Sequence, residues 1–195
     1  MDASALDDFH CAAAKVRAWL DFHFDGNGRC TIDPDEVRFY PKAPYLLCAA
    51  GLRAKGGRAA QWVLERFIDA RGDLIAPGPI ENRLYAMGWL VLGAAAVQRF
   101  DLVRVLADRL CQLQDERSGG VVLMDEDAGE EVAEVCFSGG VGMGLAAAGR
   151  TGAARRLADR FVALLDAQPH TGRYYNRFRR DGSVVDKPAA GAWGK

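Results

Sequence analysis

The chain of 195 residues is long enough for one domain with a substantial hydrophobic core. Half of its residues are hydrophobic, and 25 basic side chains nearly balance 26 acidic ones, so a strongly basic, nucleic-acid-binding character is excluded. The acidic first residues do not fit a signal peptide, and the most apolar run, 86–97, is shorter than the roughly 20 residues of a membrane span. The five cysteines show no CxxC spacing, which is typical of reduced thiols. We therefore expect a cytoplasmic protein with no nucleic-acid partner and no membrane segment.

Apolar residues at helical spacing predict helices along nearly the whole chain. A first helix is expected over 4–24, where Ser4 can cap an apolar series that starts at Leu6. Six further helices are expected over 44–53, 58–70, 80–98, 101–114, 130–148 and 152–167. The prediction is a single all-helical domain over 1–195, with an N-terminal helix and loop over 1–40 and helical hairpins over about 41–72, 79–115 and 130–168.

One pattern recurs three times: a helix end rich in small residues, a glycine break, a second helix and a glycine corner. The matching positions Phe67, Leu110 and Phe161 lie 43 and 51 residues apart. A period of this size indicates stacked helical hairpins, none of which can bury its apolar face alone.

The two helices of each hairpin differ in composition. The first is nearly apolar on all sides, as in LYAMGWLVLGAAAV, and the second alternates apolar with charged residues. The first helices are therefore expected to form an inner layer and the second helices an outer wall. Glycines at 139, 140, 142 and 144 would each cost about 1 kcal/mol relative to alanine within a helix. Close helix packing, rather than a nearby ligand, is favoured as the compensation.

Two segments carry a family resemblance. Residues 168–174, QPHTGRY, resemble the QxxxGxW repeat motif of triterpene cyclases, with Tyr174 in place of the tryptophan, and 114–121 is a looser copy. Residues 119–140, GGVVLMDEDAGEEVAEVCFSGG, are similar to the GGF…DxCYS stretch of protein prenyltransferase β subunits. The resemblance covers about 41–175 and implies an all-α fold of repeated antiparallel helical hairpins that form an α/α-toroid, or an incomplete arc of one. Six-hairpin sugar epimerases and unsaturated glycuronyl hydrolases share this architecture.

The motifs that carry chemistry in these families are not repeated in this chain. The acidic DxDD and DDxxD motifs of the cyclases are absent. The prenyltransferase resemblance implies a zinc site of Asp, Cys and His, but Glu134 replaces the Asp beside Cys136 and no His follows in the next inner helix. The segment Asp25–Glu36 reads like a calcium loop, but Arg29 and Cys30 stand where that loop needs a ligand and a glycine. We therefore expect no cofactor, and a glycine-rich turn is favoured for this segment.

The ends of the inner helices, together with the corner after the third hairpin, collect acidic and aromatic side chains. Glu81, Tyr85 and Trp89 follow one another at a spacing of four and share one face of a largely apolar helix. Acid–base chemistry on a sugar or polyene needs such carboxyls, whose pKa burial raises, beside an aromatic wall. The predicted catalytic residues are Glu81, Glu134, Tyr85 and His170. The predicted substrate-binding residues are Tyr40, Lys42, Tyr45, Asn82, Trp89, Asp127, Glu131, Tyr174 and Tyr175.

A glutamate in the first turn of a helix also offsets the helix dipole without any catalytic role. For Glu130 and Glu131, within the expected helix 130–148, this structural role is favoured. For Glu81 and Glu134 both interpretations stay open.

The leading functional hypothesis is an α/α-toroid-type enzyme. It would perform cofactor-independent acid–base chemistry (isomerisation, cyclisation, elimination or hydrolysis) on a carbohydrate-like or polycyclic/isoprenoid small molecule. The alternatives are a non-catalytic helical-repeat module that binds a protein, and a truncated remnant of a longer toroid enzyme. Because three hairpins are fewer than a closed toroid needs, a homodimer that completes the cavity is a further expectation.

Overall fold

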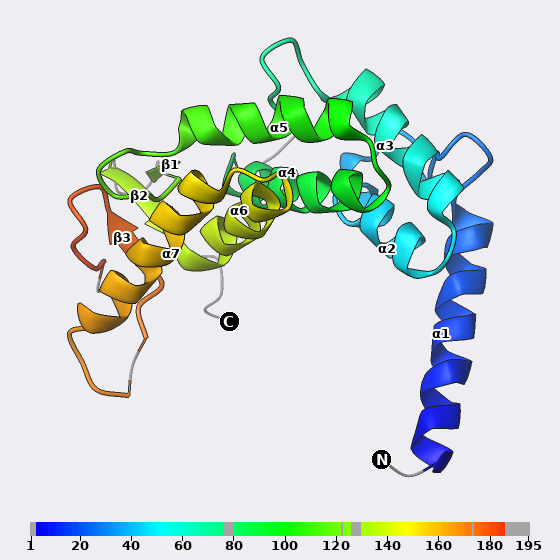
Figure 1. Cartoon of the computed structure of the whole chain (residues 1–195), viewed down its shortest axis with the longest axis horizontal. Coiled ribbons are helices and arrows are strands. Elements are labelled where there is room, and N and C mark those ends of the chain that lie inside the picture. Colours follow the sequence, from blue (N-terminus) through cyan, green and yellow to red (C-terminus); the bar gives the residue numbers. More distant parts are fainter. Residues whose placement is uncertain (1–2, 76–79, 122, 126–129, 173, 186–195) are drawn as a thin grey trace.

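The computed structural model describes residues 3–75, 80–121, 123–125, 130–172 and 174–185 (Figure 1). Most of these residues are helical, which confirms the all-α prediction in its coarse form. The helices are α1 (Ala3–His23), α2 (Ala43–Ala49), α3 (Arg53–Phe67), α4 (Ile80–Ala96), α5 (Phe100–Leu113), α6 (Val135–Ala147) and α7 (Thr151–Asp166), with a 3₁₀ turn, η1 (Val37–Phe39). The strands are β1 (Leu123–Asp125), β2 (Glu130–Glu134) and β3 (Arg177–Arg179).

The helices from α2 onward form an inner and an outer layer. The inner helix α4 packs between α2 and α6, and each of these three also contacts the helix that follows it in the chain, α3, α5 or α7. Figure 1 shows α3 and α5 along the outside of an arch, with α2, α4 and α6 beneath them. The hairpins α2–α3, α4–α5 and α6–α7 therefore occur in the order that the alternation of apolar and amphipathic helices predicts.

Each outer helix buries one stripe, whereas the inner helix α4 is buried on several sides. The buried residues of α5 are Leu102, Val103, Leu106, Ala107 and Leu110. Their spacing is that of an amphipathic helix whose other face meets water. On α4, Leu90, Val91 and Ala94 are completely buried and join the same core.

Glycines bring α4 and α6 into direct backbone contact. A Cβ atom on Gly88 would lie 2.3 Å from the carbonyl oxygen of Gly140, and one on Gly144 would lie 2.7 Å from the carbonyl oxygen of Gly88. Gly140 also leaves room for Tyr85, whose Cδ2 atom would lie 3.0 Å from an added Cβ. Close packing thus compensates the cost of glycine at 140 and 144, as expected, whereas Gly139 faces open space.

The first hairpin differs from the prediction at its turn. α2 ends at Ala49 rather than at residue 53, because Gly51, with a φ of 76°, terminates it. α3 then begins at Arg53, so the glycine pair at 56 and 57 lies inside this helix and does not break it. Gly56 allows a close approach there, since an added Cβ would lie 2.9 Å from the Cγ1 atom of Val97.

Residues 130–134 form the strand β2 and not the first turns of a helix, which corrects the prediction for 130–148. β2 pairs antiparallel with β1 on one side and with β3 on the other. The helix-dipole role that was favoured for Glu130 and Glu131 therefore does not apply, because α6 starts only at Val135.

Strand β3 supplies the reason for this difference. Phe178 of β3 is completely buried against Ala133 of β2 and Leu164 of α7. The N–H of Val135 donates to the carbonyl of Asn176 (2.9 Å) at the point where the strand gives way to the helix. Since β3 lies more than 40 residues further along the chain, local periodicity does not reveal this pairing.

Gln114, in the looser copy of the QxxxG motif, links the second hairpin to the third. Its Nε2 atom donates to the carbonyls of Gly119 (2.7 Å) and Ala153 (2.9 Å), and its Oε1 atom accepts from Arg156 (2.7 Å). Both Ala153 and Arg156 belong to α7. Gln168 instead bonds to the carbonyl of Leu164 in α7 and to the backbone of Tyr175 in its own corner. Gln114 is therefore a structural tie between its corner and the next outer helix.

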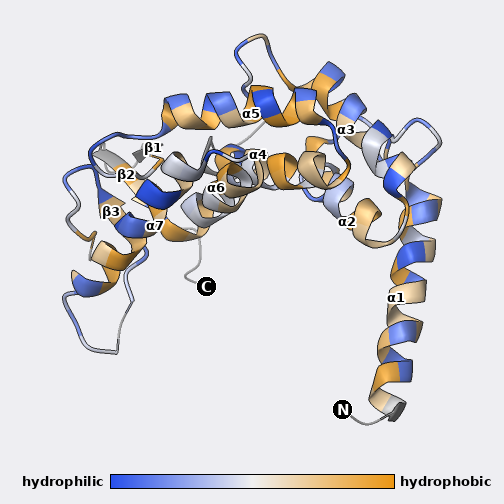
Figure 2. Ribbon diagram, viewed as in Figure 1, coloured by the Kyte–Doolittle hydropathy of each residue, from blue (hydrophilic) through white to orange (hydrophobic). Residues whose placement is uncertain are grey.

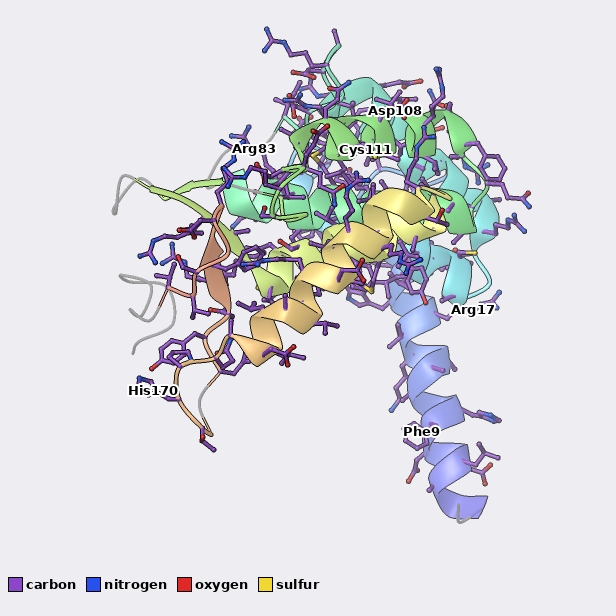
Figure 3. All side chains as sticks on the ribbon, turned by 60° about the vertical axis from the view of Figure 1, so that its left-hand side comes forward. Phe9, Arg17, Arg83, Asp108, Cys111 and His170 are labelled. Atoms are coloured by element: carbon purple, nitrogen blue, oxygen red, sulfur yellow. The ribbon has the colours of Figure 1, made fainter. Side chains whose placement is uncertain are left out.

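Helix α1 extends away from the rest of the molecule, as the two views in Figures 1 and 3 agree. Its C-terminal end is attached through Lys55, whose Nζ atom bonds to the carbonyl (2.5 Å) and the carboxylate (2.6 Å) of Asp21. Across the described part of the chain, no helix combines the length and the hydropathy that are needed to cross a bilayer.

Candidate functional site

The outer layer leaves one face of the inner helices uncovered. On α4, Tyr85, Trp89, Leu92 and Ala96 are partly exposed, and their spacing places them along one side of the helix. On α2, Tyr45 is 37% exposed. These positions lie on the helices of the inner layer, so the uncovered face is the candidate ligand-binding surface.

Aromatic side chains from three inner helices meet on this face. We call Tyr45, Tyr85, Trp89 and Phe137 the aromatic cluster. The ring centroids lie 6.0 Å apart for Tyr45 and Trp89, 6.3 Å for Tyr85 and Trp89, and 6.1 Å for Tyr85 and Phe137, all in edge-to-face geometry. The spacing of Tyr85 and Trp89 predicts their shared face, and the structure adds Tyr45 to it. The cluster therefore runs from α2 across α4 to α6.

The ammonium group of Lys42 lies over two rings of the aromatic cluster. Its Nζ atom is 4.9 Å from the ring centroid of Trp89 and 5.3 Å from that of Tyr85. Lys42 is the residue just before α2, and it is exposed. The Nε1 atom of Trp89 is buried and has no hydrogen-bond partner among the described residues. The position of Lys42 shows that the faces of the Trp89 and Tyr85 rings, which carry negative potential, attract a positive group.

Glu134 stands where β2 ends and α6 begins. Its Oε1 atom accepts a hydrogen bond from the Nδ2 atom of Asn176 (2.9 Å) and lies 3.5 Å from the Sγ atom of Cys136. Although Cys136 is exposed as a residue, partial desolvation and then the Glu134 carboxylate raise the pKa of its thiol to about 11. Cys136 is therefore a neutral thiol at pH 7. Glu134 precedes Phe137 by three residues, about one helical turn from the aromatic cluster.

Tyr40 belongs to the core, which removes it from the predicted substrate-binding set. Its side chain is fully buried, and its ring packs against Phe24 and Phe67. Its hydroxyl donates to the carbonyl of Pro34 (2.9 Å) and accepts from the N–H of Cys30 (3.0 Å). Burial raises the pKa of this phenol. Both the ring and the hydroxyl are thus engaged in holding the loop before η1 onto the core.

The corner after α7 lies apart from the aromatic cluster. His170 and Tyr174 are exposed there, and the His170 ring is 6.0 Å from that of Tyr175, whose backbone N–H donates to Gln168 (2.6 Å). Figure 3 shows His170 in this corner, far from Arg83 of α4. In the part of the chain that the structure describes, none of these three side chains makes a ring contact with the aromatic cluster.

Four further predicted site residues lie outside the side chains that the structure describes: Glu81, Asn82, Asp127 and Glu131. Their backbones put Glu81 and Asn82 in the first turn of α4 and Glu131 in β2, and Asp127 lies outside the described residues altogether. The roles of all four stay predictions.

Two contributors to the site are missing from the sequence-based set, Phe137 and Asn176. Phe137 could have been found from its place in the first turn of an inner helix, the kind of position that drew attention to Tyr45 and Tyr85. Asn176 contacts Glu134 across 42 residues of chain, and no local pattern marks this pair.

The segment Asp25–Glu36 forms a turn, as the glycine-rich composition favours. The Oδ1 atom of Asp25 accepts from the backbone N–H groups of Asn27 (2.8 Å) and Arg29 (2.9 Å). The carboxylate therefore caps its own loop. Within the described ranges, no three His, Cys, Asp or Glu side chains are grouped as ligands for a metal ion.

Comparison of the chain with protein-family models, with curated proteins and with solved structures finds no match. The fold and the site define only a general class of protein. It consists of helical hairpins and carries an aromatic cluster on its inner helices. The likeness to toroid enzymes rests on residues 119–140 and 168–174.

Proposed function

We propose that the chain forms an arc of an α/α-toroid and acts as an enzyme on a small molecule bound at the aromatic cluster. The ligand carries an apolar ring face or a chain of double bonds, as carbohydrate-like and polycyclic or isoprenoid molecules do. The reaction is an acid–base one without a cofactor: an isomerisation, cyclisation, elimination or hydrolysis.

The observation that carries this proposal is the position of the Lys42 ammonium group over the rings of Trp89 and Tyr85. An aromatic face that attracts an ammonium group also stabilises the positive charge that develops when a glycosidic bond breaks or a double bond is protonated. The same face covers the apolar side of a neutral ring. Because the Lys42 side chain is exposed and flexible, it can leave the rings when a ligand arrives.

Glu134 is the proposed proton carrier. Asn176 donates to its Oε1 atom, which orients the carboxylate at the start of α6. A carboxylate held in this way can take a proton from the substrate, and the carboxylic acid so formed can return it at another atom. Glu81, in the first turn of α4, is the proposed second acid–base group.

Binding is tested by titrating the protein with neutral methyl glycosides and, separately, with isoprenoid alcohols, while tryptophan fluorescence is recorded. Trp89→Ala should weaken binding about tenfold or more, since covering one aromatic face is worth over 1.4 kcal/mol. Trp62→Ala is the matched control, because Trp62 lies on the outer helix α3 beneath Arg29. Equal affinity of both variants for every ligand contradicts the site.

Turnover of the ligands that bind is then followed by mass spectrometry. Glu134→Gln should abolish turnover and leave the dissociation constant within a few-fold of its original value, because the amide keeps the shape of the carboxylate. Turnover that survives this change assigns the proton transfer to another residue.

A protein-binding module is the second candidate. It is favoured by Leu46 on α2 and Met143 on α6, which are 44% and 46% exposed on the inner helices. Exposed apolar side chains of this size suit a protein partner. A ligand series that shows no binding, together with a partner whose affinity falls in both Trp89→Ala and Leu46→Ala, favours this function.

A further inference from the structure

Helix α1 ends in the same kind of corner as the outer helix α3. The Oδ1 atom of Asp25 accepts from the backbone N–H groups two and four residues ahead (2.8 and 2.9 Å), and so does that of Asp69 (2.8 and 2.9 Å). Gly28 and Gly72, each three residues after the aspartate, have φ of 79° and 84°. Bridges between residues 24 and 30 and between 68 and 74 close the two corners. α1 therefore enters its corner in the same way as the outer helix α3.

The apolar stripe that an outer helix buries is exposed on α1 from Leu6 to Trp19, whereas Leu20, on the same side at its C-terminal end, is buried in the core. Leu6, Phe9, Val16 and Trp19 are 42%, 66%, 55% and 50% exposed. The outer helix α3, in contrast, buries its stripe against α2. Figure 2 shows hydrophobic residues along α1, and Figures 1 and 3 show α1 reaching away from the other helices. No helix of the described chain covers this stripe.

We propose that α1 is a dimerisation helix, which packs antiparallel against α1 of a second copy of the chain. At about 100° per residue, Phe9 and Val16 lie at the centre of the stripe. Ala12 and Ala13 lie at the middle of the helix on the same side. Small side chains at this point let the two helices cross closely, and each Phe9 then packs near Val16 of the second copy.

Charges at the edges of the stripe favour the antiparallel arrangement. Asp8 and Lys15 flank one edge of the stripe, and Arg17 flanks the other. In an antiparallel pair, each edge of the stripe faces the same edge of the stripe on the second copy. Asp8 therefore lies beside Lys15 of the second copy, and the two-fold symmetry repeats this contact. A parallel pair would set Lys15 beside Arg17 of the second copy, which is repulsive.

The area of the stripe suits a dimer that dissociates on dilution. A fully covered aromatic side chain buries about 150–250 Å². Trp19 is half exposed and Phe9 is two thirds exposed, so together they can bury roughly 200 Å² more. With Leu6, Val16 and the alanines, one helix offers on the order of 500 Å², and two helices about 1,000 Å², the lower end of specific interfaces.

Two other surfaces are alternatives for α1. A membrane is disfavoured, because the three aspartates of α1 outnumber its two basic residues and would be repelled by anionic lipid. An apolar groove of about 460 Å³ between α6 and α7, lined by Gly139, Met143, Leu157 and Phe161 among others, is the second alternative. It would take α1 of another copy in a head-to-tail contact, which lacks two-fold symmetry.

The first test is the mass of the full chain in solution, measured by light scattering from low to high micromolar concentration. The mass should rise toward twice the 21.2 kDa of one chain. Val16→Asp should return it to the monomer, whereas Ala14→Asp, which adds the same charge on the opposite side of α1, should leave the dimer intact. Circular dichroism reports whether both variants keep their helices. A monomer at all concentrations, or a dimer that Val16→Asp does not dissociate, overturns the proposal.

The second test determines the orientation of the helices. In a Cys11→Ser background, Ala12→Cys should form a disulfide between copies under mild oxidation, and Ala5→Cys should not, because antiparallel packing separates the two Ala5 positions by about 22 Å. Asp8→Lys should weaken the dimer about tenfold, and adding Lys15→Asp should restore it.

Three results overturn the antiparallel pairing. One is a disulfide through Ala5→Cys, which indicates parallel helices. Another is a dimer that Gly139→Trp dissociates, because Gly139 lines the groove between α6 and α7 and the contact is then head-to-tail. The third is a monomer that binds vesicles of neutral and anionic phospholipid and loses this binding in Val16→Asp, which assigns α1 to a membrane surface.

Discussion

Replacing Gly88 by alanine should destabilise the protein, although alanine is the better helix former. An added Cβ would lie 2.3 Å from the carbonyl oxygen of Gly140 and 2.8 Å from the backbone N of Val141. Ordinary contacts of this kind are about 3.5 Å long, so α4 and α6 must separate by about 1 Å. Both obstacles are backbone atoms, which cannot swing aside as a side chain does.

The expected net loss is about 2 kcal/mol. Forcing an extra group into a close-packed contact costs about 1–3 kcal/mol, and more where backbone must move. The gain in helix propensity from glycine to alanine returns at most about 1 kcal/mol. Gly139→Ala is the matched control on α6, because nothing lies within 4 Å of its added Cβ. It should stabilise the protein by about 0.5–1 kcal/mol.

The measurement is urea unfolding followed by circular dichroism, which gives the free energy of unfolding for each variant. The two variants should differ by about 2–3 kcal/mol, and Gly88→Ala should lower the melting temperature by about 4–8 °C. If Gly88→Ala is as stable as Gly139→Ala, the direct contact of α4 with α6 is refuted. The spacing of Tyr85 and Phe137 in the aromatic cluster would then lose its structural basis.

Three further predictions concern single residues. Gln114→Ala should cost about 1–3 kcal/mol in urea unfolding, because it removes the donor to the buried carbonyl of Gly119 and both hydrogen bonds to α7; an unchanged stability refutes the tie between the corner and α7. Alkylation of Cys136, measured in Cys11→Ser, should accelerate with pH toward a midpoint of about 11, and Glu134→Gln should lower that midpoint, because it removes the negative charge that disfavours the thiolate. Glu81→Gln should abolish turnover with little change in stability, whereas Leu106→Ala, which empties a fully buried site, should cost about 2–5 kcal/mol; equal losses of stability would make Glu81 a structural residue.

The layers of the fold were predictable because they depend on local periodicity. The buried stripe of α5 repeats every three or four residues, and α4 is apolar on nearly every side. The hydrophobic pattern of each helix therefore predicts the layer in which it lies. The strand β2 was not predictable in this way. Its sequence, EEVAE, is compatible with a helix, and the residue that decides otherwise is Phe178, which packs on Ala133 from another part of the chain.

The candidate site shows the same division. Tyr85 and Trp89 share a face, as their spacing of four on one helix predicts, and Lys42 and Tyr45 from the start of another helix lie beside them. The roles of these residues in a site stay predictions. Tyr40 was wrongly grouped with them, because the two backbone groups that satisfy its hydroxyl lie in the irregular loop before it.

The corners carry information that sequence comparison of the helices misses. Ile68 to Leu74 and Phe24 to Cys30 share few residue types apart from the aspartate and the glycine, yet they fold alike. The aspartate side chain fixes two N–H groups, and the glycine alone adopts the required positive φ without strain. An aspartate and a glycine three residues apart therefore shape both corners. α1 enters its corner as the outer helix α3 does, but its apolar stripe is exposed.

Helix packing and the aromatic cluster both depend on Gly140. The absence of a side chain there admits the backbone of Gly88 and also leaves the space that the Tyr85 ring occupies. A substitution at Gly140 would therefore disturb the helix contact and the aromatic cluster together, and its effect on a ligand could not be assigned to either. Trp89 directly follows Gly88 in α4, but its side chain lies on the same face as Tyr85, and its ring lies 6.0 and 6.3 Å from the rings of Tyr45 and Tyr85. For this reason Trp89→Ala tests the proposed ligand-binding role of the cluster, and Gly88→Ala tests the helix contact. The two variants therefore give separate answers, which a substitution at Gly140 cannot.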